Sequence, residues 1–326
     1  MKLSRAGERS LVEIARRICR RGPRVRVGIG DDAAAIDIDD RCLIATTDML
    51  AAGTHFPPGT TPEQMGRKAV VANLSDLAAM GAEPLGLIFS VALPRRFEVS
   101  FVERLVKSMD ATARKHGTYV VGGDLDESEE VTISGAAFGL AGRRELLRRS
   151  GARDGDLVAV TGKLGAASAG LKILLKKLPA TGYRKLVQAQ LEPTARVREG
   201  RVLARSGSVT AAIDVTDGLA SNLWQLARES RVRVVIERER VPEHPLVGRF
   251  AVHHKFNLDD FVLFGGEDFE LLFTVRSGGW LNVRRSLKRL GTAATVIGRV
   301  ERGRGVYIRS AGRLRPLPDR GYEHFR

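Results

Sequence analysis

The chain has 326 residues, of which 43% are hydrophobic, 28% are charged and 6% are aromatic, and its formal net charge is +15. This length suffices for two domains with substantial cores, and no apolar run approaches the roughly 18 residues of a membrane span. The first 21 residues carry charges throughout and lack the apolar core of a signal peptide, so we expect a cytoplasmic protein with no membrane contact.

The excess of Lys and Arg raises the question of nucleic acid. The Arg residues are dispersed and aromatic residues are too few to form stacking platforms, so we expect no nucleic-acid partner. Many acidic residues instead fall in short glycine-flanked turns, a pattern that suits an anionic substrate handled through metal ions. The two cysteines, Cys19 and Cys42, lack metal-ligand spacing and are predicted to be packed free thiols.

In the N-terminal part, helical and strand-like segments alternate. A first helix ends at Gly22-Pro23, and a second, Ala-rich helix is expected over 61–80, with Thr61 as N-cap and Pro62 at its first position. A third helix is expected over 100–116. Strands are predicted at 25–27, 33–38, 42–48, 85–93, 118–121 and 131–140.

The polar, turn-rich segment 143–156 is interpreted as a junction between two domains, 1–142 and 143–326. In the second domain, strands are predicted at 157–161, 209–213 and 269–275, and helices at 166–178, 195–205 and 219–230. Alternation of strands and helices in both halves indicates two mixed α/β domains.

Two adjacent carboxylates, Asp31 and Asp32, lie in a glycine turn that starts at Gly28. At about 4 Å and a dielectric near 20 such a pair repels by roughly 4 kcal/mol, so a metal ion or a basic side chain is expected beside it. The turn matches the dinucleotide pattern G-x-G-x-x-A, but the carboxylates stand where a pyrophosphate would bind and a strand follows instead of a helix. A plain structural turn stays an alternative to a metal-binding turn. No Walker A motif occurs in the chain.

Several further carboxylates stand at or just beyond the ends of predicted strands, where ligand sites gather in α/β sheets. Taken singly, such a residue is often only a cap or a turn residue. Together they indicate a Mg²⁺ site, because Mg²⁺ prefers oxygen ligands and bridges carboxylates to phosphates. The set comprises Asp32, Asp48, Asp124 and Asp214 at strand ends and Asp76 on the Ala-rich helix.

Nine segments, in order along almost the whole chain, resemble the thiamine-monophosphate kinases, of the superfamily that includes aminoimidazole ribonucleotide synthetase. In the first half they are GIGDDAA (28–34), TTD (46–48), AGTHF (52–56), KAVVANLSDLAAMGAEP (68–84), GGD (122–124) and RSGARDGD (149–156). In the second half they are DVTDGL (214–219), GGEDFEL (265–271) and GYEHF (321–325).

The resemblance implies transfer of the γ-phosphoryl group of ATP to thiamine monophosphate, with several Mg²⁺ ions, giving thiamine diphosphate. It implies a homodimer whose N-terminal sheets pair into a shared barrel, with ATP and metals in the adjoining cleft. The implied metal ligands are Asp32, Thr46, Thr47, Asp48, Asp76, Asp124, Asp214 and Asp217. The implied ATP contacts are Gly123, Asp124, Arg149 and Thr216, with His116 where members carry an aromatic residue near the nucleotide. The implied substrate contacts are His55, Glu267 and Tyr322.

The chemistry of this reaction agrees with the residues present. The acceptor phosphate has a second pKa near 6 and is largely ionised at neutral pH, so no general base is needed. Metal ions would neutralise and align two anionic groups, and Arg149, or alternatively Arg148 or Arg144, would add positive charge. Tyr322 would stack on a flat heteroaromatic ring, although a core tyrosine is an alternative, and a substrate role for His55 is likewise one of two readings.

Other ATP-using members of the superfamily fit less well. Selenophosphate synthetases carry a reactive residue before a glycine-rich stretch, whereas Cys19 lies in a helical pattern. Hydrogenase-maturation members end in a functional cysteine, whereas this chain ends in Phe325-Arg326. Aminoimidazole ribonucleotide synthetase remains the alternative, with AGTHF and GGEDFEL favouring the thiamine enzyme.

Overall fold

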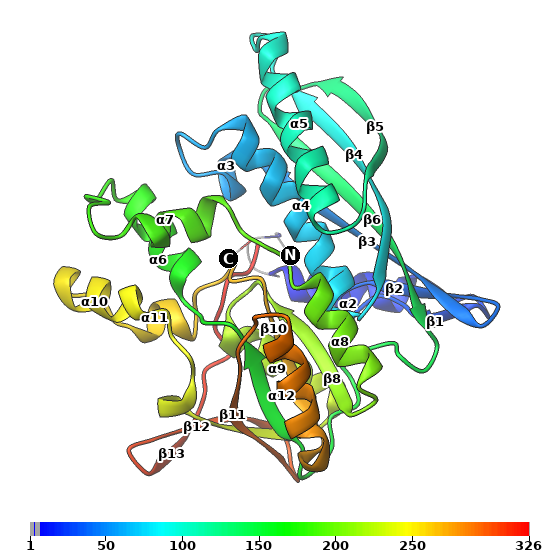
Figure 1. The fold of residues 1–326 in the computed structure, drawn as a ribbon, viewed down its shortest axis with the longest axis vertical. Coiled ribbons are helices and arrows are strands. Elements are labelled where there is room, and N and C mark those ends of the chain that lie inside the picture. Colours follow the sequence, from blue (N-terminus) through cyan, green and yellow to red (C-terminus); the bar gives the residue numbers. More distant parts are fainter. Residues whose placement is uncertain (1–2, 4–6, 326) are drawn as a thin grey trace.

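The computed structural model describes residue 3 and residues 7–325 of the chain, which form a two-domain, mixed α/β fold around two β-sheets (Figure 1). The first sheet has six strands in the order β1-β2-β3-β6-β4-β5. Its neighbours are antiparallel except β4 and β5, which run parallel. The strands are β1 (Val25–Val27), β2 (Ala34–Ile38), β3 (Arg41–Ala51), β4 (Glu83–Leu93), β5 (Val120–Glu127) and β6 (Thr132–Gly142).

The second sheet has seven strands in the order β13-β12-β9-β11-β7-β10-β8, and only β9 and β12 run parallel. The strands are β7 (Leu157–Thr161), β8 (Val209–Val215), β9 (Arg233–Glu237), β10 (Glu270–Val275), β11 (Ala294–Glu301), β12 (Gly305–Ser310) and β13 (Arg313–Pro316). Each strand predicted from the sequence overlaps a strand of the structure, but the strand predicted over 42–48 runs from Arg41 to Ala51, so Asp48 lies inside β3 and not at a strand end. Both sheets are mainly antiparallel.

Helices cover both sheets. In the first half they are α2 (Glu8–Ile18), α3 (Ala52–His55), α4 (Pro62–Ala79) and α5 (Val99–Lys115). In the second half they are α6 (Ala166–Leu175), α7 (Arg184–Leu191), α8 (Val197–Arg205), α9 (Leu219–Ser230), α10 (Pro245–His254), α11 (Asp259–Val262) and α12 (Trp280–Arg289), with 3-10 turns at Arg238–Arg240 and Ser277–Gly279. The sequence did not predict α3, α7, α10, α11 or α12, and α6 ends three residues earlier than expected.

Helix α4 runs through the middle of the molecule and is buried on most sides (Figure 1). It starts as predicted: Thr61 Oγ1 accepts a hydrogen bond from Gln64 N–H, Gln64 Oε1 accepts one from Thr61 N–H, and Pro62 follows. Small residues allow close packing on both sides, because a Cβ at Gly66 would lie 2.5 Å from Leu105 O and one at Gly200 only 2.0 Å from Ala78 O. The helix therefore joins the first sheet to α8 of the second half.

Two other local predictions are corrected. The segment Gly122–Asp124 lies inside β5 and not in a turn after a strand, since the pairing with β4 continues from Val120 to Glu127. Gly123 is needed there because a Cβ would lie 2.1 Å from Phe89 O, a close backbone approach that favours glycine in a strand. Cys42 is buried as predicted, but Cys19 is exposed at the end of α2.

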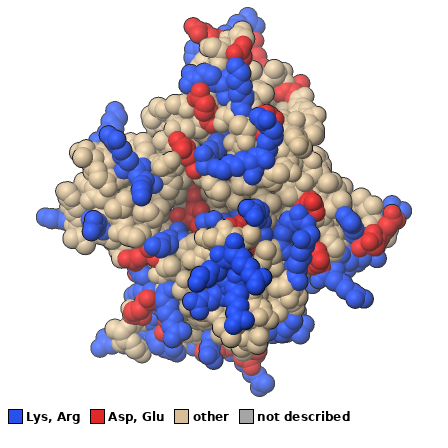
Figure 2. Space-filling view, in the orientation of Figure 1, with Lys and Arg blue, Asp and Glu red and all other residues tan. Residues whose placement is uncertain are grey.

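Charge is spread unevenly over the surface. Figure 2 shows Lys and Arg over much of the face in view, densest over α12, whose sequence includes Arg284, Arg285, Lys288 and Arg289. Among the described residues, no helix is both long and apolar enough to cross a membrane. The two ends of the described chain lie close together near the middle of the view in Figure 1, and Glu8 N–H donates to His324 O at 3.3 Å.

Candidate active site

A cleft of about 980 Å³ lies where the two halves meet. Its walls are the glycine turn before β2, the middle of β3, one residue of α4, the end of β8, and parts of α2 and of the C-terminal segment. The predicted residues that line it are Asp32, Thr46, Thr47, Asp48, Asp76, Arg149, Asp214, Thr216, Asp217 and Tyr322. Residues far apart in the sequence thus share one cavity of a size that accommodates small-molecule ligands.

Three carboxylates converge at the floor of this cleft. Asp32, Asp76 and Asp214 each offer an oxygen, and these oxygens all lie within 4.8 Å of one another. Their positions are set by neutral donors: Thr46 Oγ1 donates to Asp76 Oδ2 at 2.5 Å, and Ser75 Oγ donates to Asp214 Oδ2 at 2.6 Å. Because α4 supplies both Asp76 and Ser75, packing of α4 between the two sheets brings the cluster together.

The carboxyl groups of the cleft hold their protons unusually well. Burial, followed by repulsion from Asp48, Asp214 and Asp32, raises the pKa of Asp76 well above its usual range. Burial and the charge of Asp32 raise the pKa of Asp214 to about 8. For Asp48, burial and the charge of Asp217 raise the pKa to about 6. When these carboxyl groups are ionised they repel one another, and a cation bound nearby would stabilise the ionised form.

Arg149 provides part of that positive charge. Its Nε and one terminal nitrogen donate to Asp32 Oδ1 at 3.2 and 2.7 Å, and its backbone N–H donates to Asp31 Oδ1 at 3.1 Å. The two neighbouring carboxylates therefore differ in role. Asp31 also accepts from the N–H of Asp32 and closes the turn, with its pKa raised to about 7 by burial and by Asp32.

Asp32 Oδ2 is buried and has no hydrogen-bond partner. An orphaned carboxylate oxygen of this kind is costly unless a ligand completes it. Together with the all-oxygen donor set, this atom fits a hard cation such as Mg²⁺ better than a soft metal.

The other residues of β3 and β8 border the carboxylate cluster. Thr46 faces Asp76, whereas Thr47 Oγ1 donates to Gly135 O at 2.7 Å. Asp217 Oδ2 accepts from Gln225 at 3.0 Å, and Thr216 Oγ1 donates to Asp214 Oδ1 at 3.4 Å. The four residues Thr46, Thr47, Thr216 and Asp217 line the cleft, next to the carboxylate cluster.

Gly123 and Asp124 stand apart. Both are exposed on the edge strand β5, which is separated from β3 by β6 and β4. Neither lines the cleft of the single chain. A contact with metal or ATP therefore remains a prediction for these two residues.

The three predicted substrate contacts come together near the rim. Lys68 Nζ lies 2.5 Å from Glu267 Oε1 and donates to His55 O at 2.8 Å. The ring of His324 lies 5.3 Å from that of His55 and 4.9 Å from that of Tyr322, between centroids. Sequence reasoning missed Lys68; its only signal was a lysine at the start of an otherwise apolar run.

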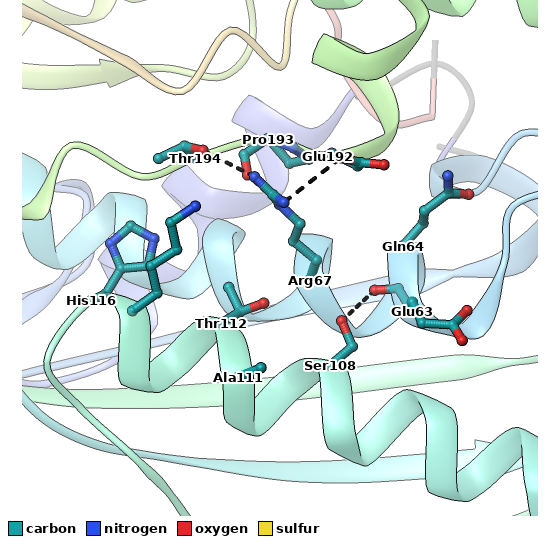
Figure 3. Close-up of a pocket in the computed structure, with 11 residues that line it drawn as sticks. Glu63, Gln64, Arg67, Ser108, Ala111, Thr112, His116, Glu192, Pro193 and Thr194 are labelled. Carbon is teal, nitrogen blue, oxygen red and sulfur yellow. Dashed lines mark hydrogen bonds and ion pairs between the residues drawn. The ribbon is translucent and has the colours of Figure 1, made fainter.

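His116 lies in a different cavity, of about 270 Å³, between α4, α5 and the segment after α7 (Figure 3). Arg67 crosses this cavity and donates to Pro193 O at 2.9 Å and to Thr194 Oγ1 at 3.2 Å. Burial, then the charges of Lys115 and Arg67, lower the pKa of His116. The structure does not bring His116 to the acidic cleft, so its predicted contact with ATP stays untested.

Comparisons with known proteins place the chain in the AIR synthase-related family. A family model described as the AIR synthase related protein, N-terminal domain, matches residues 30–141, and the corresponding C-terminal domain matches 153–310. A thiamine-monophosphate kinase of Pyrococcus horikoshii is 38% identical over 91% of this chain and 91% of its own length. Its counterpart from Aquifex aeolicus is 33% identical over 100% of both chains. A solved structure, AaThiL complexed with AMPPCP and TMP, is 33% identical and superposes with a TM-score of 0.89 over 99% of each chain.

Proposed function

The chain belongs to the thiamine-monophosphate kinases of the AIR synthase-related family, and on that premise we propose that its acidic cleft transfers the γ-phosphoryl group of ATP to thiamine monophosphate. The observation that supports this most is the convergence of Asp32, Asp76 and Asp214 within 4.8 Å at the floor of the cleft. The solved structure of the relative AaThiL is a complex with AMPPCP and TMP.

The acceptor is a phosphate monoester, which is largely ionised at neutral pH and can attack without a general base. Mg²⁺ bound by the carboxylates would neutralise the two anionic partners and hold them in line. The proposed ligands are Asp32, Thr46, Thr47, Asp48, Asp76, Asp214 and Asp217, with Asp124 considered below. Arg149 keeps the Asp32 carboxylate in place, and the hydroxyls of Ser75 and Thr46 orient the other two acids.

The substrate would lie toward Glu267, His55 and Tyr322. Tyr322 is half-exposed and lines the same cleft as the carboxylates, and its backbone N–H donates to Asp217 O at 2.9 Å. A flat heteroaromatic ring can stack on such a tyrosine. Thr216, whose carbonyl accepts the N–H of Glu267 at 2.8 Å, links this group to the proposed ATP side of the cleft.

A homodimer is proposed because β5 leaves an open, apolar sheet edge. Val121 and Leu125 of this strand are 65% and 64% exposed, and Tyr119 beside it is 59% exposed. Exposed apolar edge strands are sites of pairing with another chain. Pairing of the N-terminal sheets of two copies into a barrel would cover this edge and place Gly123 and Asp124 at the interface. Sedimentation equilibrium of the wild type and of Val121→Lys tests this: a monomeric wild type would contradict it.

The division at residues 142 and 143, between β6 and β7, and a cytoplasmic location remain predictions from the sequence. The two sheets are consistent with that division, because β6 ends at Gly142 and β7 begins at Leu157.

The decisive assay incubates the purified chain with ATP, Mg²⁺ and thiamine monophosphate and separates thiamine diphosphate chromatographically. Formylglycinamidine ribonucleotide is offered in parallel, because aminoimidazole ribonucleotide synthetases share the superfamily. We expect thiamine diphosphate and ADP in equal amounts. No turnover, or turnover only with the ribonucleotide, would refute the proposal.

A further inference from the structure

Lys68 is a buried cation in a helix that is otherwise mostly apolar. Its side chain is 4% exposed, and its ammonium group contacts Glu267 Oε1 at 2.5 Å and His55 O at 2.8 Å. Burying a lysine is costly unless its charge is paired and its protons are bonded. This lysine reaches from α4 in the first half to the loop before β10 in the second, and both of its contacts are residues proposed to touch thiamine monophosphate.

Glu267 is held at its backbone as well as at both carboxylate oxygens. Gln190 of α7 donates from Nε2 to Glu267 Oε2, so each oxygen has a donor of its own. The N–H of Glu267 donates to Thr216 O at 2.8 Å, and its φ of 66° lies in the left-handed region that non-glycine residues seldom adopt. Strain of this kind persists only where the surroundings impose it, and it gathers at ligand sites.

The carboxylate is nevertheless able to accept more. Each carboxylate oxygen can accept two hydrogen bonds, and the Glu267 side chain is 26% exposed, so acceptor capacity faces outward. Gln190, by contrast, is 2% exposed and its Oε1 has no partner. The amide is thus kept in place by the bond that it donates to Glu267, although its other end is unsatisfied. The hydrogen bond therefore holds the Glu267 carboxylate, while the buried amide oxygen of Gln190 is left without a partner.

We propose that Lys68 and Gln190 are positioning residues, which hold the Glu267 carboxylate in one orientation so that it accepts a hydrogen bond from the exocyclic amino group of the pyrimidine of thiamine monophosphate. This inference rests on the proposed contact between Glu267 and the substrate. A site that holds its acceptor in one orientation rejects an analogue that lacks the matching N–H far more strongly than a flexible one does. Lys68 and Gln190 therefore determine specificity without touching the reacting phosphates.

The experiment compares Lys68→Met, Gln190→Leu and Glu267→Gln with the double variant Lys68→Met/Glu267→Gln. For each, kcat and KM are measured for ATP, for thiamine monophosphate and for its analogue without the pyrimidine amino group. Arg201→Met is the matched control, because it also breaks an ion pair between the two halves, with Glu83 at 2.6 Å. Thermal unfolding of every variant identifies those that fail to fold.

Lys68→Met and Gln190→Leu are expected to raise KM for thiamine monophosphate by about tenfold and to leave kcat and KM for ATP within about twofold, because uniform substrate binding is what they weaken. In the Glu267→Gln background, Lys68→Met should add less than about twofold, since residues that act through one another are not additive. The preference of the wild type for the aminated substrate over the analogue should shrink in all three single variants. Arg201→Met should change none of these values.

Two different failures are distinguishable. If Glu267→Gln leaves KM for thiamine monophosphate unchanged while turnover continues, the contact of Glu267 with the substrate is wrong, and the positioning inference falls with it although the kinase activity stands. If Glu267→Gln raises that KM but neither Lys68→Met nor Gln190→Leu does, the positioning inference alone is overturned. Additive effects in the double variant, or equal effects on ATP, would also overturn it, since they indicate a general structural role. If Lys68→Met does not fold, the kinetic values of Gln190→Leu test the positioning inference by the same criteria.

Discussion

Replacing Asp76 by Asn should stabilise the metal-free protein while abolishing its activity. Asp76 lies in a cluster whose carboxylate oxygens are within 4.8 Å of one another. Two unit charges at that distance repel by about 3.5 kcal/mol at an effective dielectric near 20. Because burial and the neighbouring acids raise the pKa values of Asp76 and Asp214, only part of this repulsion is present, and we expect a gain of about 2 kcal/mol at pH 8.

The gain should depend on pH in a defined direction. Burial and the neighbouring acids raise the pKa of Asp76 well above its usual range, and burial with the charge of Asp32 raises that of Asp214 to about 8. The folded protein therefore keeps protons that the unfolded chain releases above about pH 4. The unfolding free energy of the metal-free wild type falls as the pH rises from about 4 to about 8, and the variant should lose less over the same range.

The assay is thermal unfolding after EDTA treatment, at pH 5 and at pH 8, with and without millimolar Mg²⁺. At pH 8 without metal we expect Asp76→Asn to unfold about 3 °C above the wild type, with a smaller difference at pH 5. Mg²⁺ should raise the unfolding temperature of the wild type and do little for the variant, whose turnover should fall at least about 100-fold. Asp110→Asn, on α5 and outside the cleft, serves as control, because it removes a carboxylate that is paired with Arg114 on the surface of that helix.

A lower unfolding temperature of Asp76→Asn at pH 8 without metal would refute the electrostatic reasoning. So would equal stabilisation of variant and wild type by Mg²⁺, because the cluster would then not be where the ion binds.

Three smaller predictions concern the surroundings of the cluster. Ser75→Ala removes the donor to Asp214 Oδ2 and should lower the unfolding free energy by about 1–3 kcal/mol in urea titrations, so unchanged stability would count against that hydrogen bond. Arg149→Met leaves the buried Asp32 carboxylate without its guanidinium and should cost about 3 kcal/mol or more in the same titrations, and a neutral effect would contradict its role. Cys19 is exposed and should react with a thiol reagent in the native protein, whereas burial raises the pKa of the Cys42 thiol and delays its reaction until unfolding; simultaneous labelling in mass spectrometry would contradict this.

Several features of this protein could be predicted from the sequence, because they depend only on residues that are close together in the chain. Thr61 and Pro62 predicted the start of α4, because a side-chain acceptor and a proline satisfy the first turn of a helix wherever it lies. The Asp31-Asp32 pair predicted a need for positive charge, since two adjacent carboxylates repel in any fold. The set of oxygen donors predicted a hard cation, and the donor atoms of the cleft agree with that choice.

Tertiary structure decided what depends on distance between remote residues. The packing of α4 brings Asp76 to Asp32 and Asp214. Pairing with β4 places Asp124 on an open edge, outside the cleft of a single chain. The contact of Lys68 with Glu267 joins the two halves of the chain, and no local pattern encodes it. Residue types and short spacings set which chemistry is available, whereas long-range packing sets which of those groups meet, because contacts between remote segments exist only once both cores have formed.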